Sequence, residues 1–159
     1  MLKIKIVAVG KIKERALSAL IGEYTKRLGR YCSLEIIEVP DESIPARESE
    51  ASIVKRISDE AGRVLARVRA GAYIIALGIE GDSPDSEGLA RKLNELAVQC
   101  PEIYFLIGGS HGLHPGILSR SDYILSLSRL TFPHQLSRLI LLEQLYRSFK
   151  INNREIYHK

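Results

Sequence analysis

Residues 103–159 read IYFLIGGSHGLHPGILSRSDYILSLSRLTFPHQLSRLILLEQLYRSFKINNREIYHK, and this stretch decides the fold. The β-branched and aromatic run at 103–107 predicts a buried strand that ends at a glycine turn. A second strand is predicted at 123–126, and the apolar segment 133–150 predicts a long final helix. Strands that alternate with helices and lack an inside–outside alternation are typical of a parallel sheet covered on both faces. The sequence therefore predicts an α/β fold.

The same alternation of strands and helices continues toward the N-terminus. Strands are predicted at 3–9, 34–39 and 73–77, and helices at 13–28, 49–68, 89–97 and 115–119. The polar stretches PDESIPARES (40–49) and GIEGDSPDSEG (78–88) are predicted to be loops, with Ser86 as the N-cap of the next helix. At 159 residues, the chain is expected to form one domain, 1–159.

Composition excludes several classes of protein. Hydrophobic residues make up 45% of the chain and charged residues 26%, which suits a globular protein with one core. No apolar run approaches the roughly 18 residues of a membrane span, so no membrane partner is expected. Cys32 and Cys100 stand alone, and the four histidines lack a neighbouring cluster of carboxylates or thiolates. This pattern predicts a cytoplasmic protein without a metal site.

Charge is distributed unevenly along the chain. Residues 1–31 carry a net charge of +6, residues 32–128 carry −6, and residues 129–159 carry +4. If the two basic ends meet in space, they form a positive face that suits phosphate groups. A solvated surface with uneven charge is the simpler alternative.

The carboxyl ends of the predicted strands mark the expected ligand site. They fall at Gly10, 77–81, 108–112 and 126–134. Glycines at 108–112 allow a backbone to approach a ligand closely, although Pro115 delays the following helix and the dinucleotide fingerprint fails. The segment SLSRLTFPH (126–134) is rich in hydroxyl and backbone groups, which suit the edge of a heterocycle better than a metal.

Residues 108–112 also match the GxSxG pattern of a serine hydrolase. Asp122 and His134 follow Ser110 in the order of a catalytic triad. A nucleophile elbow leads directly into a helix, however, and Pro115 would fall in its second turn at a cost of about 3 kcal/mol. The hydrolase is therefore the less favoured alternative.

The final helix and the tail offer further candidates. His134 and Arg138 share one helical face, and Glu143 and Arg147 share the opposite one as a surface salt bridge. The remaining positions are apolar nearly all round, so the helix needs a second buried side, either a partner subunit or a deep monomer core. The tail INNREIYHK combines cations with a tyrosine ring, which suits a phosphate and a base, although composition alone favours a frayed end.

The chain resembles the RlmH family, SPOUT-class methyltransferases that act on 23S rRNA. The resemblance spans the whole length, and its two longest blocks are highly specific. The matching blocks are KIVAVGKIKE, EYTKRL, IIEVPDE, FLIGGSHGL, SLSRLTFPHQLSRLILLEQLYRSFKI and the terminal YHK. The resemblance implies a SPOUT-type α/β fold with a C-terminal trefoil knot, an exception to unknotted connections, and a homodimer packed through the knot. Knot and cofactor loops are expected within about 73–150.

The resemblance also implies that S-adenosylmethionine is the methyl donor and that three strand-end loops hold it. On the matching positions, the cofactor residues are Leu77, Gly81, Gly108, Gly109, Leu127, Ser128, Arg129, Leu130, Thr131 and Phe132. The implied substrate is N3 of a pseudouridine in 23S rRNA on the assembled ribosome. A ribosome-binding protein without catalytic activity is the alternative from another class.

The expected reaction transfers a methyl group to an imide nitrogen and needs positioning and removal of the N3 proton. Arg138 is predicted to stabilise the deprotonated imide, His158 to act as a base, and Tyr157 to lie near the reacting base. Arg154 and Lys159 are predicted to contact RNA. The tail is expected to reach the partner subunit's cofactor, whereas His134 is interpreted as a structural residue at the helix start.

Overall fold

The computed structural model of the protein describes residues 1–41 and 46–157. Its strands are β1 (Leu2–Val9), β2 (Cys32–Val39), β3 (Tyr73–Asp82), β4 (Glu102–Ile107) and β5 (Tyr123–Leu125). Its helices are α1 (Arg15–Leu28), α2 (Glu50–Leu65), α3 (Ser86–Gln99), α4 (Pro115–Arg120) and α5 (His134–Asn152). The strands form one sheet in the order β2-β1-β4-β3-β5, and each of its strand pairings is parallel. The predicted parallel α/β sheet is confirmed.

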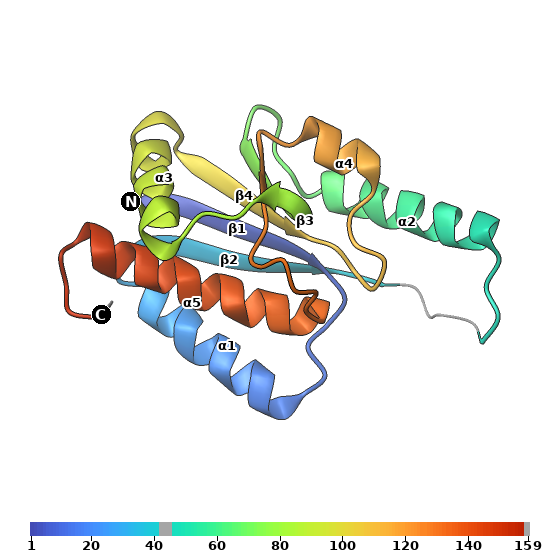
Figure 1. The fold of residues 1–159 in the computed structure, drawn as a ribbon, viewed down its shortest axis with the longest axis horizontal. Helices are drawn as coiled ribbons and strands as arrows, with labels where there is room; N and C mark the ends of the chain where they lie inside the picture. The colour runs from blue at the N-terminus through green and yellow to red at the C-terminus, as the bar shows by residue number, and fades with distance from the viewer. Residues whose placement is uncertain (42–45, 158–159) are drawn as a thin grey trace.

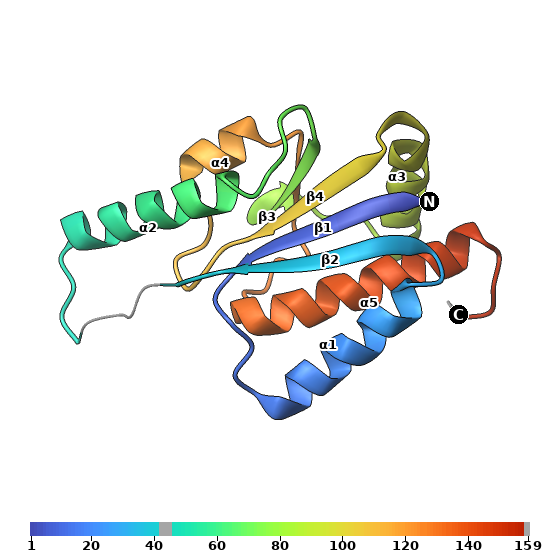
Figure 2. The same cartoon turned by 180° about the vertical axis from the view of Figure 1, so that it is seen from behind.

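Helices cover both faces of the sheet (Figure 1 and Figure 2). On β1, Ile4 and Ile6 pack with α1, α3 and α5, whereas Val7 and Val9 pack on the other face with residues of α2 and α4. All four side chains are at most 1% exposed. Two buried faces explain why the strands lack an alternation of apolar and polar residues.

β3 is longer than its apolar run suggested, so the loop predicted at 78–88 is wrong in its first five residues. After a register shift, Asp82 pairs with Leu125, and the Ser126 N–H donates to the Asp82 carbonyl at 2.8 Å. Gly81 permits this approach, because a Cβ there would lie 2.4 Å from the Ile124 carbonyl oxygen. The extension depends on tertiary pairing, which the local composition does not reveal.

The N-cap predicted at Ser86 is also wrong by one residue. Asp85 caps α3 instead, and its carboxylate accepts a hydrogen bond from the Gly88 N–H at 2.7 Å. The Ser86 hydroxyl donates to the side-chain oxygen of Gln144 at 2.8 Å. Ser86 therefore ties the start of α3 to the middle of α5.

α5 lies between α1 and α3 against the sheet (Figure 1). Leu141, Leu142 and Leu145 are completely buried in this layer. Leu136 and Ile140 are only half-buried, so a single chain leaves some apolar surface on α5 uncovered. No helix in the described part of the chain is long and apolar enough to cross a membrane.

Candidate functional site

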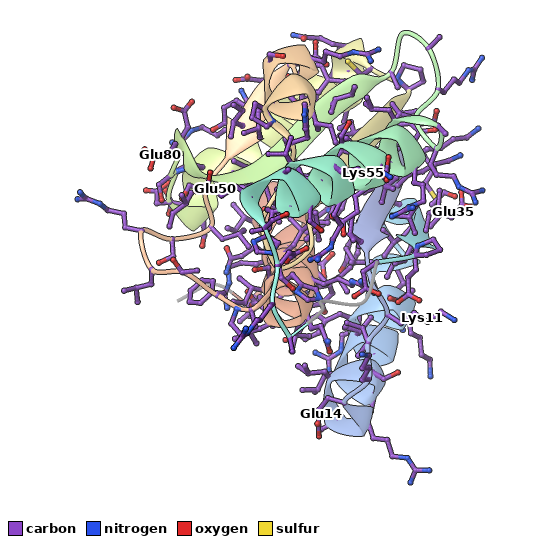
Figure 3. All side chains as sticks on the ribbon, turned by 90° about the vertical axis from the view of Figure 1, so that its right-hand side faces the viewer. Lys11, Glu14, Glu35, Glu50, Lys55 and Glu80 are labelled. Atoms are coloured by element: carbon purple, nitrogen blue, oxygen red, sulfur yellow. The ribbon has the colours of Figure 1, made fainter. Side chains whose placement is uncertain are left out.

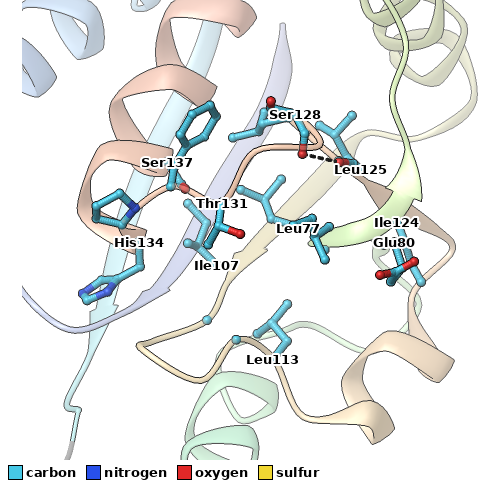
Figure 4. Close-up of a pocket in the computed structure, with 18 of the residues that line it drawn as sticks. Leu77, Glu80, Ile107, Leu113, Ile124, Leu125, Ser128, Thr131, His134 and Ser137 are labelled. Atoms are coloured by element: carbon cyan, nitrogen blue, oxygen red, sulfur yellow. Dashed lines mark hydrogen bonds between the residues drawn. The ribbon is translucent and has the colours of Figure 1, made fainter.

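A cavity of about 890 Å³ lies beyond the carboxyl ends of β3, β4 and β5. Its walls come from the end of β3, the glycine turn after β4, the loop after β5 and the start of α5 (Figure 4). Leu77, Ile107, Leu113 and Leu125 give it a largely apolar lining. This is the position where parallel α/β sheets bind ligands.

The glycine turn at 108–112 forms one wall from backbone. The Gly112 N–H donates to the Gly109 carbonyl at 3.0 Å, and this bond closes the turn. A Cβ at Gly108 would lie only 2.3 Å from the Gly112 carbonyl carbon, and Gly112 itself has a φ of +74°. Because side chains at these positions would displace the turn, the glycines let peptide groups face the cavity directly.

The loop after β5 is held by its own hydroxyl groups. The Ser126 hydroxyl donates to the Ser128 carbonyl at 2.9 Å, and the Ser128 hydroxyl accepts from the Leu130 N–H at 3.0 Å (Figure 4). Thr131 and Phe132 continue the lining toward α5. The loop therefore keeps a fixed shape and offers further backbone groups to a ligand.

Eight of the ten cofactor residues expected from the sequence line this cavity. They are Leu77, Gly108, Gly109, Leu127, Ser128, Leu130, Thr131 and Phe132. Gly81 and Arg129 do not line it: Gly81 lies against Ile124, and Arg129 is exposed. The three predicted loops are thus brought together around one cavity.

His134 also lines the cavity, beside Ser137 from the next turn of α5 (Figure 4). As expected, it is the first residue of the helix, and it ends the segment 126–134 that the sequence marked for a ligand, although the sequence interpretation gave it only a structural role. Burial lowers the pKa of His134 below 6.5, while Asp41 acts in the opposite direction and Arg138 and Lys13 lower the pKa further. The imidazole is therefore neutral at neutral pH and can accept a proton. The sequence signal for a role of His134 in the site was its place at the end of the predicted ligand segment 126–134.

Arg138 lies behind the cavity and is only 1% exposed. Its guanidinium donates to Glu38 Oε1 at 2.5 Å and to the Gly10 carbonyl at 3.0 Å. Gly10 has a φ of +87°, and a Cβ there would lie 3.4 Å from the His134 ring. Arg138 therefore fastens the ends of β1 and β2 to α5, close to His134.

The described part of the C-terminal tail follows the end of α5 that is opposite to His134 (Figure 1). The Tyr157 hydroxyl donates to Glu143 Oε1 at 3.1 Å, and the Arg147 guanidinium lies 4.8 Å from the tyrosine ring centroid. Burial raises the pKa of Tyr157, with hydrogen bonding to Tyr24 adding to the effect. The salt bridge between Glu143 and Arg147 is present at 2.7 Å, but it is part of this tail contact, a link that the sequence interpretation missed.

Of the other three tail residues predicted for the site, the structure describes only Arg154. Arg154 is exposed, with a φ of +56°. His158 and Lys159 lie outside the described residues. α5 has 19 residues, so its two ends are about 28 Å apart at about 1.5 Å per residue. Tyr157 folds back only as far as Glu143 in the middle of this helix, and neither Tyr157 nor Arg154 lines the cavity.

The serine-hydrolase arrangement does not form. Ser110 follows the carboxyl end of β4, whereas Asp122 accepts a hydrogen bond from the Ile74 N–H at 2.7 Å near the start of β3. Ser110 therefore lies beyond the carboxyl ends of the parallel strands, whereas Asp122 lies near their amino ends. α4 also begins only at Pro115, after a seven-residue connection from β4. The GxSxG pattern is therefore a turn and not a nucleophile elbow.

Comparisons with known proteins identify the family of the chain. Residues 2–158 match the family model described as "Predicted SPOUT methyltransferase". The chain is 50% identical to the "Ribosomal RNA large subunit methyltransferase H" of Bifidobacterium adolescentis, over 99% of this chain and 100% of the relative.

Two solved structures share the fold. A putative methyltransferase from Legionella pneumophila, in complex with the bound cofactor SAM, has a TM-score of 0.50 at 13% identity, and the match covers 95% of this chain and 66% of that one. A probable methylase family protein from Haemophilus influenzae Rd KW20 has a TM-score of 0.52 at 15% identity, over 99% of this chain and 70% of that one. The chain belongs to the SPOUT methyltransferase family, as its sequence motifs predicted.

Proposed function

We propose that this protein is an S-adenosylmethionine-dependent methyltransferase that modifies the RNA of the large ribosomal subunit. The observation that carries the proposal is the cavity built from three strand-end loops, in a chain 50% identical to a ribosomal RNA large subunit methyltransferase. The finer substrate that we propose is N3 of a pseudouridine in 23S rRNA, presented on the assembled ribosome.

The cavity suits S-adenosylmethionine in size and chemistry. A volume of about 890 Å³ is within the range of cofactor sites, and its apolar walls combine with backbone groups as such sites usually do. The turn at Gly108–Gly112 would hold the methionine part, and the loop at 127–132 would hold the adenine. When bound, S-adenosylmethionine supplies a methyl group activated by a sulfonium.

The chain's own residues supply positioning and proton removal. His134 lines the cavity and burial lowers its pKa, so we propose that its neutral imidazole accepts the N3 proton of a target base held there. His158 remains a second candidate for this role. Arg138 is buried behind His134 and bonded to Glu38, so we propose that it acts on the site by holding Gly10 and His134 rather than by touching the base.

We further propose a homodimer in which the tail of one subunit completes the cavity of the other, with the C-terminal trefoil knot at the interface. Two observations support this arrangement. α5 carries the half-buried apolar residues Leu136 and Ile140, and Tyr157 is hydrogen-bonded to Glu143 and does not line the cavity of its own chain. In a dimer, Tyr157 and His158 would meet the partner's cofactor, while Arg154 and Lys159 would contact RNA.

Transfer of label from methyl-tritiated S-adenosylmethionine to unmodified ribosomes tests the proposal. We expect label in large-subunit rRNA and a large reduction when free rRNA replaces ribosomes. A non-catalytic ribosome-binding protein would sediment with ribosomes and transfer no label, and that result would refute the proposed activity. Equal labelling of free rRNA would refute the requirement for the assembled ribosome.

A further inference from the structure

Buried charges lie beneath the glycine turn, on the side of the sheet covered by α2. Glu48, in the segment before α2, has a side chain only 8% exposed and forms an ion pair with Arg56, which is 6% exposed. Glu60, one turn further along α2, is also buried, at 7%. None of these three residues lines the cavity. Because buried charges are costly, their position under the turn needs a reason.

Other charges of the same segment lie in solvent. Glu50 and Lys55 are exposed and belong to the outer side of α2 (Figure 3). Burial is therefore selective among the charged side chains of this segment. This contrast also supplies a control, because Glu50 is two residues from Glu48 and carries the same group.

Two carboxylates reach the turn from below. Glu48 Oε2 lies 3.9 Å from His111 Nε2, and His111 lines the cavity. Glu60 Oε2 lies 3.6 Å from the position that a Cβ at Gly109 would occupy. One oxygen of Glu48 forms the ion pair with Arg56, and the other is the oxygen that lies near His111.

The turn needs such an anchor because of its composition. Glycines lose more conformational freedom on ordering than other residues, and three of the five residues at 108–112 are glycines. A turn that is already held in its binding conformation does not have to be ordered by the ligand. His111 is the largest side chain of the turn, so it is the natural point at which α2 can hold it.

We propose that Glu48, fixed by Arg56, is a positioning residue that holds the cofactor turn through His111. This inference rests on the proposed function, since it concerns the affinity of the same cavity for S-adenosylmethionine. Glu48 touches neither cofactor nor substrate, so its loss raises the KM for S-adenosylmethionine and leaves kcat and the KM for ribosomes nearly unchanged.

Calorimetric titration of Glu48→Gln and Glu50→Gln with S-adenosylmethionine tests the proposal. We expect Glu48→Gln to bind about tenfold more weakly, within the usual range for coupled neighbours, and Glu50→Gln to bind as the unchanged protein does. His111→Gln leaves the pair between Glu48 and Arg56 intact, so it tests the same contact without disturbing the buried charges. His111→Gln should weaken binding by a similar factor. The double variant Glu48→Gln with His111→Gln should lose little further affinity. Unchanged affinity in His111→Gln, or fully additive losses, would overturn the inference.

Hydrogen exchange of the protein without cofactor separates this inference from the proposed function. We expect the amides of residues 109–112 to exchange faster in both Glu48→Gln and His111→Gln, with unchanged exchange in β1. If the unchanged protein fails to bind S-adenosylmethionine but the turn still loosens in the variants, the proposed function is wrong and the anchor is correct. Unaltered exchange of the turn in both variants refutes the proposal that Glu48 holds the turn through His111.

Discussion

Replacing Glu38 with glutamine removes the carboxylate that pairs with Arg138. The guanidinium is 1% exposed, and its Nε has no hydrogen-bond partner among the described residues. In the variant, the Gly10 carbonyl and the neutral amide oxygen of glutamine can still accept hydrogen bonds, but the counter-charge is gone. Breaking a buried ion pair by removing one partner typically costs about 3–5 kcal/mol. Glu38 is 34% exposed, which places the expected loss at the lower end, at about 3 kcal/mol. For a chain of this size, the melting temperature falls by about 6–12 °C.

Urea unfolding of Glu38→Gln, with Glu35→Gln as the control, measures this loss. Glu35 lies on the same strand and pairs with Lys5 at 3.3 Å, but its side chain is 58% exposed. Its replacement should change the unfolding free energy by less than about 0.5 kcal/mol. In the double variant Glu38→Gln with Arg138→Met, the buried charge is gone, so the total loss should be smaller than the sum of the two single losses. A Glu38→Gln variant as stable as Glu35→Gln would refute the conclusion that the buried ion pair between Glu38 and Arg138 stabilises the fold.

Three further predictions concern the cavity and the tail. Gly108→Ala places a Cβ 2.3 Å from the Gly112 backbone, so calorimetry should show at least about tenfold weaker binding of S-adenosylmethionine, and an unchanged Kd would contradict the role of the turn. The pKa of His134 is lowered in the folded protein, so its neutral form contributes stability that is fully present above pH 6.5 and is lost as the pH falls through the folded pKa. His134→Gln should therefore lose less unfolding free energy than the unchanged protein between about pH 7 and pH 5, and parallel losses would contradict the assignment. Deletion of residues 154–159 should abolish methyl transfer while leaving the sedimentation of the dimer unchanged, and a truncated protein with normal transfer would rule out the tail as part of the site.

The sequence was sufficient to predict the elements whose signals are local. The apolar runs at β1, β2 and β4 and the helical stripes of α1 and α3 need no knowledge of distant partners. The three loops that surround the cavity could also be located, because strand ends mark ligand sites in parallel sheets. What they would bind came from the resemblance to a known family, since a glycine turn alone does not identify its ligand.

The features that escaped prediction depend on contacts between distant segments. β3 continues to Asp82 only because Leu125 pairs with it across a register shift. Arg138 can be buried because Glu38, a hundred residues earlier, supplies its counter-charge. No local sequence pattern indicates that the two residues pair. The Glu143–Arg147 pair has the spacing of a surface salt bridge, and only the folded tail shows that Tyr157 joins it.

Mass mapping of rRNA tests the central claim most directly. Ribosomes that lack the modification are incubated with the protein and S-adenosylmethionine, and the 23S rRNA is digested and compared with a reaction that contains Gly108→Ala. The account predicts one added methyl group on a pseudouridine with the unchanged protein and little or none with the variant. No added methyl group, or one placed equally well by Gly108→Ala, would contradict the assignment of the cavity as the cofactor site of an rRNA methyltransferase.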